Sequence, residues 1–385
     1  MKSLVLVGAG HAHVQVLRAW AAAPLPGVEL VLVSPQALAP YSGMVPCWLA
    51  GAWGFDDTCI NAAALAAAAG ARWLADAVVS LDPVTRQLRL GQRALLAYDV
   101  LSLDIGSTLY PPAPQTLPTG VRLLAMRPLD GLQARWDALL AEYLDANPET
   151  AWHVTAVGGG AAGVESLLAM LARLRALRPH RRVSGTLVSR SAGLLPGMAS
   201  GAVRAAHAAL AAAGITLYLG VDFDPAVHRG AVGVCHVVLW AAGAQAQHWP
   251  QHSGLATDGQ GFIAVDAQLR SLSHPEVHAA GDCAAWPQPL PKSGVYAVRM
   301  GPVLTRNLRA ALGQGSAATY TPQRRALALL STADGRAIAA WGPLSAQGRW
   351  VQRWKQRIDI AFVQRHAVPA AALSSNFPPA SGDSA

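Results

Sequence analysis

Short apolar runs alternate along the chain with longer stretches in which apolar residues recur every third or fourth position. The runs predict buried strands, and the longer period predicts helices. We expect strands at 4–7, 28–33, 154–157 and 185–189, and helices at 13–23 and 163–175. The order strand, helix, strand thus occurs twice. Because such alternation is typical of parallel sheets covered by helices, the pattern predicts an α/β fold with two similar units.

A glycine-rich turn joins the first strand of each unit to its helix. The glycines are Gly8 and Gly10 in the first turn, and Gly158, Gly160 and Gly163 in the second. Glycines at this spacing let the backbone turn tightly and approach a pyrophosphate, while the helix N-terminus offers its N–H groups. Two matches, each between a strand and a helix, predict two dinucleotide-binding units.

Both units depart from the ideal pattern. His13 stands where the first turn should have a third glycine, and we count it with His11 among the cofactor-binding candidates; packing or helix capping is the alternative. The acid expected after the second strand is missing: Ser34 or Pro35 stands there in the first unit, and Ser189-Arg190 in the second. Ser34 can still bond a ribose hydroxyl. Without an acid, NADH is not favoured over NADPH, and Arg190 could meet a 2′-phosphate or be a solvated loop residue.

A third segment lies near the end of the chain. Gly281-Asp282 ends a predicted strand, and a helix is expected to begin near Gly294. The carboxylate can bond a ribitol hydroxyl, and the helix N-terminus can stabilise the negative charge on a reduced flavin.

In this order of motifs the chain resembles the pyridine nucleotide-disulfide oxidoreductase family, from about residue 3 to about residue 313. It is similar to type II NADH dehydrogenases and sulfide:quinone reductases, and more so to the flavoprotein domain fused to selenophosphate synthetase. That last likeness rests on residues 10–14, 41–46 and 292–299. The resemblance implies two Rossmann-like, three-layer ββα domains, the second inserted in the first. It also implies FAD as cofactor, with Gly106 in the segment Asp104-Ile105-Gly106-Ser107 closing the first part of its site, and NAD(P)H as co-substrate.

The expected organisation follows from the motif order. We place the FAD-binding domain at 1–112 and 245–315, an NAD(P)-binding-like domain at 113–244, a small C-terminal α+β piece at 316–369 and a flexible tail at 370–385. The tail is rich in Ala, Ser, Pro and Gly, a composition that does not pack a core. Residues 109–118, which include four prolines, are expected to form a strand that crosses between the domains.

Five further side chains are candidates for the flavin site. Tyr41 and Ser42 are expected to line the flavin, unless their loop only packs on the domain. Lys292 could favour a reduced, anionic flavin, and Glu165 could stand near the nicotinamide entrance. The alternatives are a solvated lysine and a helix-start carboxylate. Cys47 could be a nucleophile for sulfur or selenium compounds, or a lone buried thiol.

Cysteine usage limits the chemistry further. Cys47, Cys59, Cys235 and Cys283 form no CxxC or CxxxxC pair. A redox disulfide and a metal site are therefore not expected, and a reducing cytoplasm is the expected location. No apolar run reaches the roughly 18 residues that a membrane span needs.

Composition and net charge limit the classes of molecule that the protein is expected to bind. Hydrophobic residues make up 52% and charged residues 14%, which excludes a disordered chain. The net charge of +8 favours polyphosphate ligands, nucleic acid or an anionic membrane surface. Since the motifs indicate dinucleotides, we expect no nucleic acid partner.

One segment has the pattern of a helix that binds to a membrane surface. In residues 349–366, Trp350, Trp354, Ile358 and Phe362 recur every fourth position beside a row of arginines. Such a basic helix with an aromatic ridge is typical of an interfacial helix on anionic lipid. We expect peripheral contact at the cytoplasmic face. A ridge packed on the protein's own core, or in a dimer contact, is the alternative.

The sequence supports three functional hypotheses. The first is an FAD-dependent oxidoreductase that passes a hydride from NAD(P)H through FAD to a quinone or other small acceptor, without a redox disulfide. The second is a flavoprotein that oxidises a sulfur or selenium compound at Cys47 without nicotinamide. The third is a non-enzymatic flavoprotein partner of selenophosphate synthetase.

Overall fold

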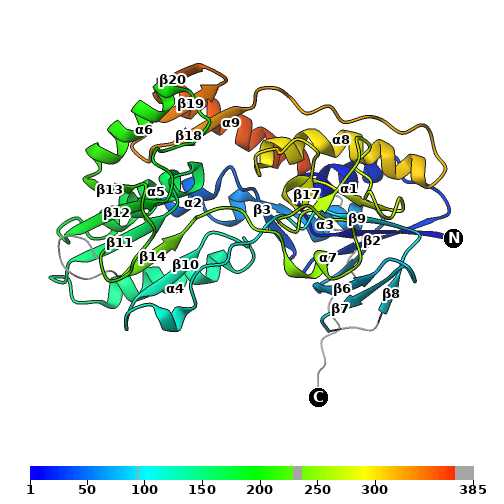
Figure 1. Cartoon of the computed structure of the whole chain (residues 1–385), viewed down its shortest axis with the longest axis horizontal. Helices are drawn as coiled ribbons and strands as arrows, with labels where there is room; N and C mark the ends of the chain where they lie inside the picture. The colour runs from blue at the N-terminus through cyan, green and yellow to red at the C-terminus, as the bar shows by residue number, and fades with distance from the viewer. Residues whose placement is uncertain (93–94, 229–235, 369–385) are drawn as a thin grey trace, which may run out of the picture.

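Two parallel sheets form the two lobes of the molecule, which lie side by side in Figure 1. The computed structural model describes residues 1–92, 95–228 and 236–368. Cys235 and the predicted tail lie outside these residues. The predicted α/β class with two Rossmann-like sheets is confirmed.

The first lobe is a three-layer domain around a sheet with strand order β16-β9-β1-β2-β5. Side chains of β1 alternate between the layers: Leu4 and Leu6 pack against the helices, and Val5 and Val7 against the small second sheet. The strands of the main sheet are β1 (Lys2–Val7), β2 (Val28–Val33), β5 (Arg72–Leu74), β9 (Val100–Leu103) and β16 (Val277–Ala279). The helices are α1 (His13–Ala22), α3 (Ala62–Ala68) and α8 (Gly294–Ala311), and the second sheet consists of β6 (Val78–Asp82), β7 (Gln87–Leu90) and β8 (Leu95–Ala97).

The second lobe repeats the parallel arrangement with strand order β10-β14-β11-β12-β13. Its strands are β10 (Arg122–Ala125), β11 (Trp152–Val157), β12 (Val183–Ser189), β13 (Ile215–Leu219) and β14 (Val237–Trp240). Its helices are α4 (Leu132–Asp145), α5 (Ala161–Leu177) and α6 (Ser200–Ala212). Because β16 returns to pair with β9 of the first sheet, the second lobe is inserted in the first.

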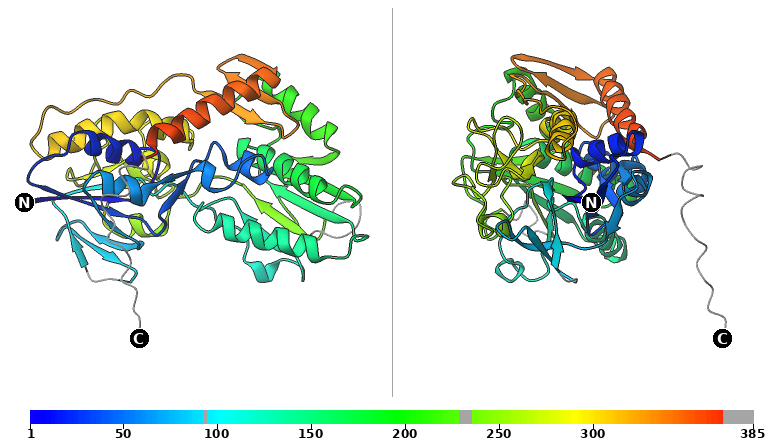
Figure 2. Two further views of the ribbon diagram at one scale, coloured as in Figure 1. Left: turned by 180° about the vertical axis from the view of Figure 1, so that it is seen from behind. Right: turned by 90° about the vertical axis from the view of Figure 1, so that its right-hand side faces the viewer.

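A C-terminal piece connects the two lobes. It consists of the antiparallel strands β18 (Leu327–Ser331), β19 (Ala337–Trp341) and β20 (Leu344–Gly348), followed by α9 (Arg349–His366). Near its start α9 packs on β19 through Val351, and near its end Phe362 joins the core of the first lobe. Figure 2 shows α9 running from the small sheet back to α1 and α8.

Short elements fill the connections. These are β3 (Leu38–Pro40), α2 (Val45–Leu49), β4 (Cys59–Asn61), α7 (His248–Gln251), β15 (Ile263–Ala264) and β17 (Ala284–Ala285), with 3-10 turns at Asp56–Thr58, Pro114–Thr116 and Gly281–Cys283. Among the described residues, no helix combines the length and apolarity needed to cross a membrane.

The predicted crossing strand at 109–118 is wrong. An isolated bridge between Thr108 and Gln245 precedes it, and residues 114–116 form a 3-10 turn. Proline carries no N–H to donate to a strand ladder, so a stretch with four prolines cannot sustain one.

Candidate functional site

The first glycine turn packs against the end of β9. Gly8 has φ +87°, and a Cβ at this position would overlap the backbone of Asp104. At Gly10 a Cβ would overlap the carboxyl group of the same residue. Both positions therefore require glycine because of Asp104, which fills the space beside the turn.

Asp104 is a site residue whose importance the sequence did not reveal. Its Oδ2 accepts hydrogen bonds from the N–H groups of Ala12, at 2.8 Å, and His13, at 3.0 Å. It also lies against Gly281, where a Cβ would come within 2.6 Å of Oδ1. Burial raises the pKa of Asp104 to about 6. This carboxyl group thus ties together all three FAD motifs at the N-terminus of α1.

Asp282 lies where the two lobes meet. Its Oδ2 accepts a hydrogen bond from Ser107 Oγ at 3.2 Å and forms an ion pair with Arg127. Arg127 follows β10 of the second lobe, so the ion pair joins the lobes across the expected ribitol site. Beside it, Gly106 has φ +66°, and a Cβ there would meet no described atom within 4 Å. No sequence pattern pointed to Arg127.

Four predicted cofactor residues converge at the start of α8. His11 Nε2 lies 3.3 Å from Ser42 Oγ, and the rings of His11 and Tyr41 have centroids 5.2 Å apart. A Cβ on Gly294 would lie 3.2 Å from Ser42 Oγ and 3.4 Å from His11 Nε2. Among the described residues, no side chain caps α8 at its N-cap Ser293. The first N–H groups of α8 are thus available to an acceptor.

His13 is packed between helix α1 and the main sheet of the first lobe. It is fully buried, with Nδ1 2.6 Å from Gly8 O and Nε2 2.8 Å from Ser102 Oγ. Burial lowers its pKa to about 4, so the ring is neutral. The imidazole therefore fills the space between helix and sheet where a third glycine would stand, which favours the packing alternative; a contact of His13 with the cofactor stays a prediction.

Ser34 and Lys292 both bond to their own surroundings. Ser34 is 5% exposed and its Oγ donates to Gln36 O at 3.2 Å. Lys292 Nζ donates to Ala284 O at 2.8 Å and lies 3.6 Å from the centroid of the Phe262 ring. Burial lowers the pKa of Lys292. Their roles toward a cofactor stay predictions.

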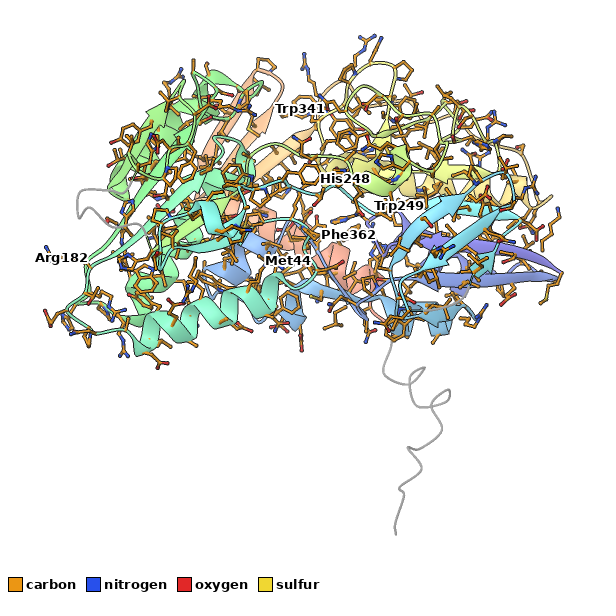
Figure 3. The ribbon with its side chains drawn as sticks, turned by 60° about the horizontal axis from the view of Figure 1, so that its bottom comes forward. Met44, Arg182, His248, Trp249, Trp341 and Phe362 are labelled. Atoms are coloured by element: carbon orange, nitrogen blue, oxygen red, sulfur yellow. The ribbon has the colours of Figure 1, made fainter. Side chains whose placement is uncertain are left out.

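A group of ionisable side chains, which we name the charge cluster, comes from the loop before α2, from α5 and from α9; it comprises Tyr41, Glu165, Lys355 and Asp359. Lys355 Nζ lies 2.8 Å from Asp359 Oδ2 and donates to Gly43 O at 2.6 Å. The side chains of this pair are only 4% and 8% exposed. Burial raises the pKa of Asp359, against the lowering effects of Lys355 and of the neighbouring Tyr41 side chain. In Figure 3, Met44 and Phe362, neighbours of the cluster in sequence, lie between the lobes.

Ionisation in the charge cluster is perturbed. Burial raises the pKa of Glu165 to about 7, against the lowering effect of Lys355. Burial lowers the pKa of Lys355, but the charges of Glu165 and Asp359 outweigh it, so the net shift is upward. Near neutral pH the cluster thus holds a charged ammonium and a carboxyl group that can bind or release a proton.

Glu165 is oriented toward the C-terminal piece. Its Oε1 accepts a hydrogen bond from Ser331 N at 2.7 Å. Glu165 therefore links α5 of the second lobe to β18, a contact that the helix-start and nicotinamide-entrance hypotheses did not foresee. A role at the nicotinamide entrance stays a prediction.

Cys47 lies on α2 close to the charge cluster. It is 5% exposed, and burial raises the pKa of its thiol, as it does for Cys59 and Cys283. The three cysteines that the structure describes are free. A thiol with a raised pKa is a weak nucleophile near neutral pH, which favours the buried-thiol alternative.

The second glycine turn leaves open space at Gly160, whereas the first turn is filled at Gly10. At Gly163 a Cβ would overlap the carbonyl oxygen of Gly158, so helix and strand approach closely. At Gly160, which has φ −78°, a Cβ would meet no described atom within 4 Å. Within the described chain, no side chain caps α5 and no acid lies in its first turn. The N-terminus of α5 can therefore receive a phosphate directly.

The residues present fit two dinucleotides. FAD fits the first site, which offers open space at Gly106, the Asp282 carboxylate and the free N-terminus of α8. A nicotinamide dinucleotide fits the second site, where the turn is open at Gly160. The fold and the site thus define a two-domain dinucleotide-binding oxidoreductase. The family model described as pyridine nucleotide-disulphide oxidoreductase matches residues 2–301, and the chain belongs to this family.

Membership establishes an FAD-dependent oxidoreductase that uses NAD(P)H. A search of curated proteins finds no match. Among solved structures, the chain is similar to the sulfide:quinone oxidoreductase of Aquifex aeolicus, at 14% identity and a TM-score of 0.74, covering 96% of this chain and 94% of that one. The NDH2 of Plasmodium falciparum in complex with NADH has 12% identity, a TM-score of 0.74 and coverages of 94% and 98%. A ferredoxin reductase from Rhodopseudomonas palustris has 21% identity, a TM-score of 0.69 and coverages of 88% and 82%.

Proposed function

We propose that the protein passes electrons from NAD(P)H through FAD to a quinone or a similar small acceptor, without a redox disulfide. The observation that carries this proposal is the charge cluster, which places protonatable side chains between the flavin-domain loop, α5 and α9. Reduction of a quinone follows NAD(P)H + H⁺ + quinone → NAD(P)⁺ + quinol. One proton travels with the hydride, and the protein must supply the other.

FAD, when bound, accepts the hydride and passes the electrons on. Glu165 is the group suited to hold the second proton because its pKa lies near 7. Lys355 stays charged and stabilises negative charge that develops on the acceptor. Tyr41 connects Asp359 to His11, whose ring lies 5.2 Å away beside the start of α8.

The pH dependence of acceptor reduction tests this assignment. A proton donor acts only in its protonated form, so the rate at which reduced protein is oxidised by a water-soluble quinone should fall as pH rises through about 7. In Glu165→Gln the amide oxygen can still accept from Ser331 N, but no proton is available. In this variant we expect the quinone to oxidise the reduced protein about a hundredfold more slowly than the wild type. The decrease of the rate as pH rises through about 7 should also be lost.

The same experiment has clear controls. The rate at which NAD(P)H reduces the flavin should change little in Glu165→Gln. Hydride transfer moves one proton together with two electrons, so this step needs no proton from Glu165. A Glu165→Gln protein that keeps both the wild-type oxidation rate and its pH limb would rule out the proton role.

The sulfur hypothesis has a specific test at Cys47. If sulfide reduces the flavin in the wild type but not in Cys47→Ser, while NAD(P)H reduces both, a sulfur or selenium compound becomes the second substrate. A flavin that NADH, NADPH and sulfide all fail to reduce would instead favour the non-enzymatic partner of selenophosphate synthetase.

Contact with a membrane at the cytoplasmic face is a further part of the proposal. Trp350, Trp354 and Ile358 are 53%, 39% and 39% exposed, and the two indole rings stack with centroids 6.3 Å apart. Phe362, expected in the same ridge, is 8% exposed and stacks on Tyr41 instead. Phe362 points inward because this end of α9 packs against the first lobe.

Liposome flotation tests the membrane contact. Binding should require anionic lipid and weaken at high salt, because each arginine contributes about 1 kcal/mol near the surface. Trp350→Glu combined with Trp354→Glu should abolish flotation, whereas the matched Trp350→Phe with Trp354→Phe should retain most of it. An intact protein that does not float even at low salt would refute the contact.

A further inference from the structure

The end of β12 carries the features that decide which nicotinamide dinucleotide a Rossmann domain accepts. Val157 at the end of β11 pairs with Val188 of β12, so residues 189–191 lie beside the glycine turn at the same edge of the sheet. Leu195 N donates to Gly159 O at 2.8 Å, which holds the following loop against that turn. The adenosine ribose of a bound dinucleotide belongs at this place.

No acid stands at the end of β12, where a carboxylate would bind the ribose hydroxyls; Ser189, Arg190 and Ser191 stand there instead. Ser189 is buried, and its Oγ accepts from Ser191 N at 3.2 Å, so it shapes a turn in the backbone. The turn is fixed to the end of β13, because Val221 N donates to Ser189 O at 3.2 Å and Gly220 N to Ser191 O at 3.1 Å. Arg190 projects from this turn with 80% of its side chain exposed.

Asp222 lies near Arg190 but interacts with it only weakly. The shortest contact between the Arg190 guanidinium and Asp222 is 3.9 Å, and the Asp222 side chain is 86% exposed. A pair this open to solvent contributes little. The guanidinium can therefore turn to a phosphate, which accepts two parallel hydrogen bonds from it.

We infer that the second lobe selects NADPH over NADH, with Arg190 as the residue that recognises the adenosine 2′-phosphate. This inference rests on the proposed function only in that it names the electron donor of the same site. The open turn at Gly160 receives the pyrophosphate common to both dinucleotides, and Arg190 distinguishes them.

Two measurements on the FAD-loaded protein test the inference. The first is calorimetric binding of adenosine 2′,5′-bisphosphate and of AMP, which involves no flavin chemistry. The second is the ratio of kcat/KM for NADPH and NADH. We expect the bisphosphate to bind at least about tenfold more tightly than AMP, and Arg190→Ala to remove that preference, since a charge-assisted pair contributes about this much.

Arg182 provides the matched control. It is exposed and precedes β12, at the opposite end of the strand from Arg190, and Figure 3 shows it at the outer tip of the lobe. Arg182→Ala should leave both preferences unchanged, and Asp222→Asn should strengthen the preference for the 2′-phosphate. Equal binding of the two nucleotides by the wild type, or a preference that survives Arg190→Ala, would overturn the inference. Flavin that neither dinucleotide reduces would refute the proposed function, while the calorimetric comparison would still decide the role of Arg190.

Discussion

A Gly160→Val protein should fold and retain FAD, yet its flavin should be reduced by NADPH at least about a hundredfold more slowly than in the wild type. The backbone at Gly160 has φ −78°, which valine adopts without strain, and a Cβ there meets no described atom within 4 Å. The valine side chain therefore enters the space reserved for the pyrophosphate, and excludes the dinucleotide without disturbing the protein.

The matched control is Gly259→Val, which also adds a side chain in open space, in a surface turn of the first lobe. This variant should be reduced at the wild-type rate. Gly10→Val is a poorer probe than its motif implies, because its side chain would overlap Asp104 as well as block FAD. Rapid mixing with NADPH under anaerobic conditions measures the rates. Wild-type reduction of folded Gly160→Val would exclude the second lobe as the donor site.

Lys355→Met should lower both stability and acceptor reduction. It leaves the carboxyl groups of Asp359 and Glu165 buried without their cation, a change that typically costs about 3–5 kcal/mol. We expect the midpoint of thermal unfolding to fall by several degrees. Oxidation of the reduced protein by a quinone should slow about a hundredfold, because the cation that stabilises developing charge is gone.

A second substitution separates these two effects. Lys355→Met with Asp359→Asn removes both charges of the ion pair, so stability should return toward the wild-type value. Acceptor reduction should stay slow, since neither substitution restores the cation. If quinone reduction recovers together with stability, the charge cluster has a structural role only, and the proton supply must lie elsewhere.

The local pattern of apolar and polar residues was sufficient to predict much of the fold. The end of β2 at Val33, the end of β12 at Ser189 and both ends of α9 agree with the sequence prediction. These elements carry their own signals, namely apolar runs that stop at turn residues and a ridge with helical period. The two glycine turns were equally visible because their function depends on residues that are adjacent in sequence.

The decisive contacts of the site were not visible in the sequence. Asp104 meets His13 across 91 positions, Arg127 meets Asp282 across 155, and Lys355 meets Gly43 across 312. Contacts this distant in sequence arise only once the lobes and α9 have packed. Phe362 illustrates the same limit, since a period of four residues cannot tell which part of a ridge the neighbouring lobe covers.

An anaerobic titration of the FAD-loaded protein with NADPH, followed by absorbance, shows whether the flavin accepts electrons from NADPH and passes them to a quinone. The absorbance of oxidised flavin should disappear with a stoichiometric amount of NADPH and return when a water-soluble quinone is added. A flavin spectrum that remains unchanged with excess NADPH and excess NADH would contradict the proposed function.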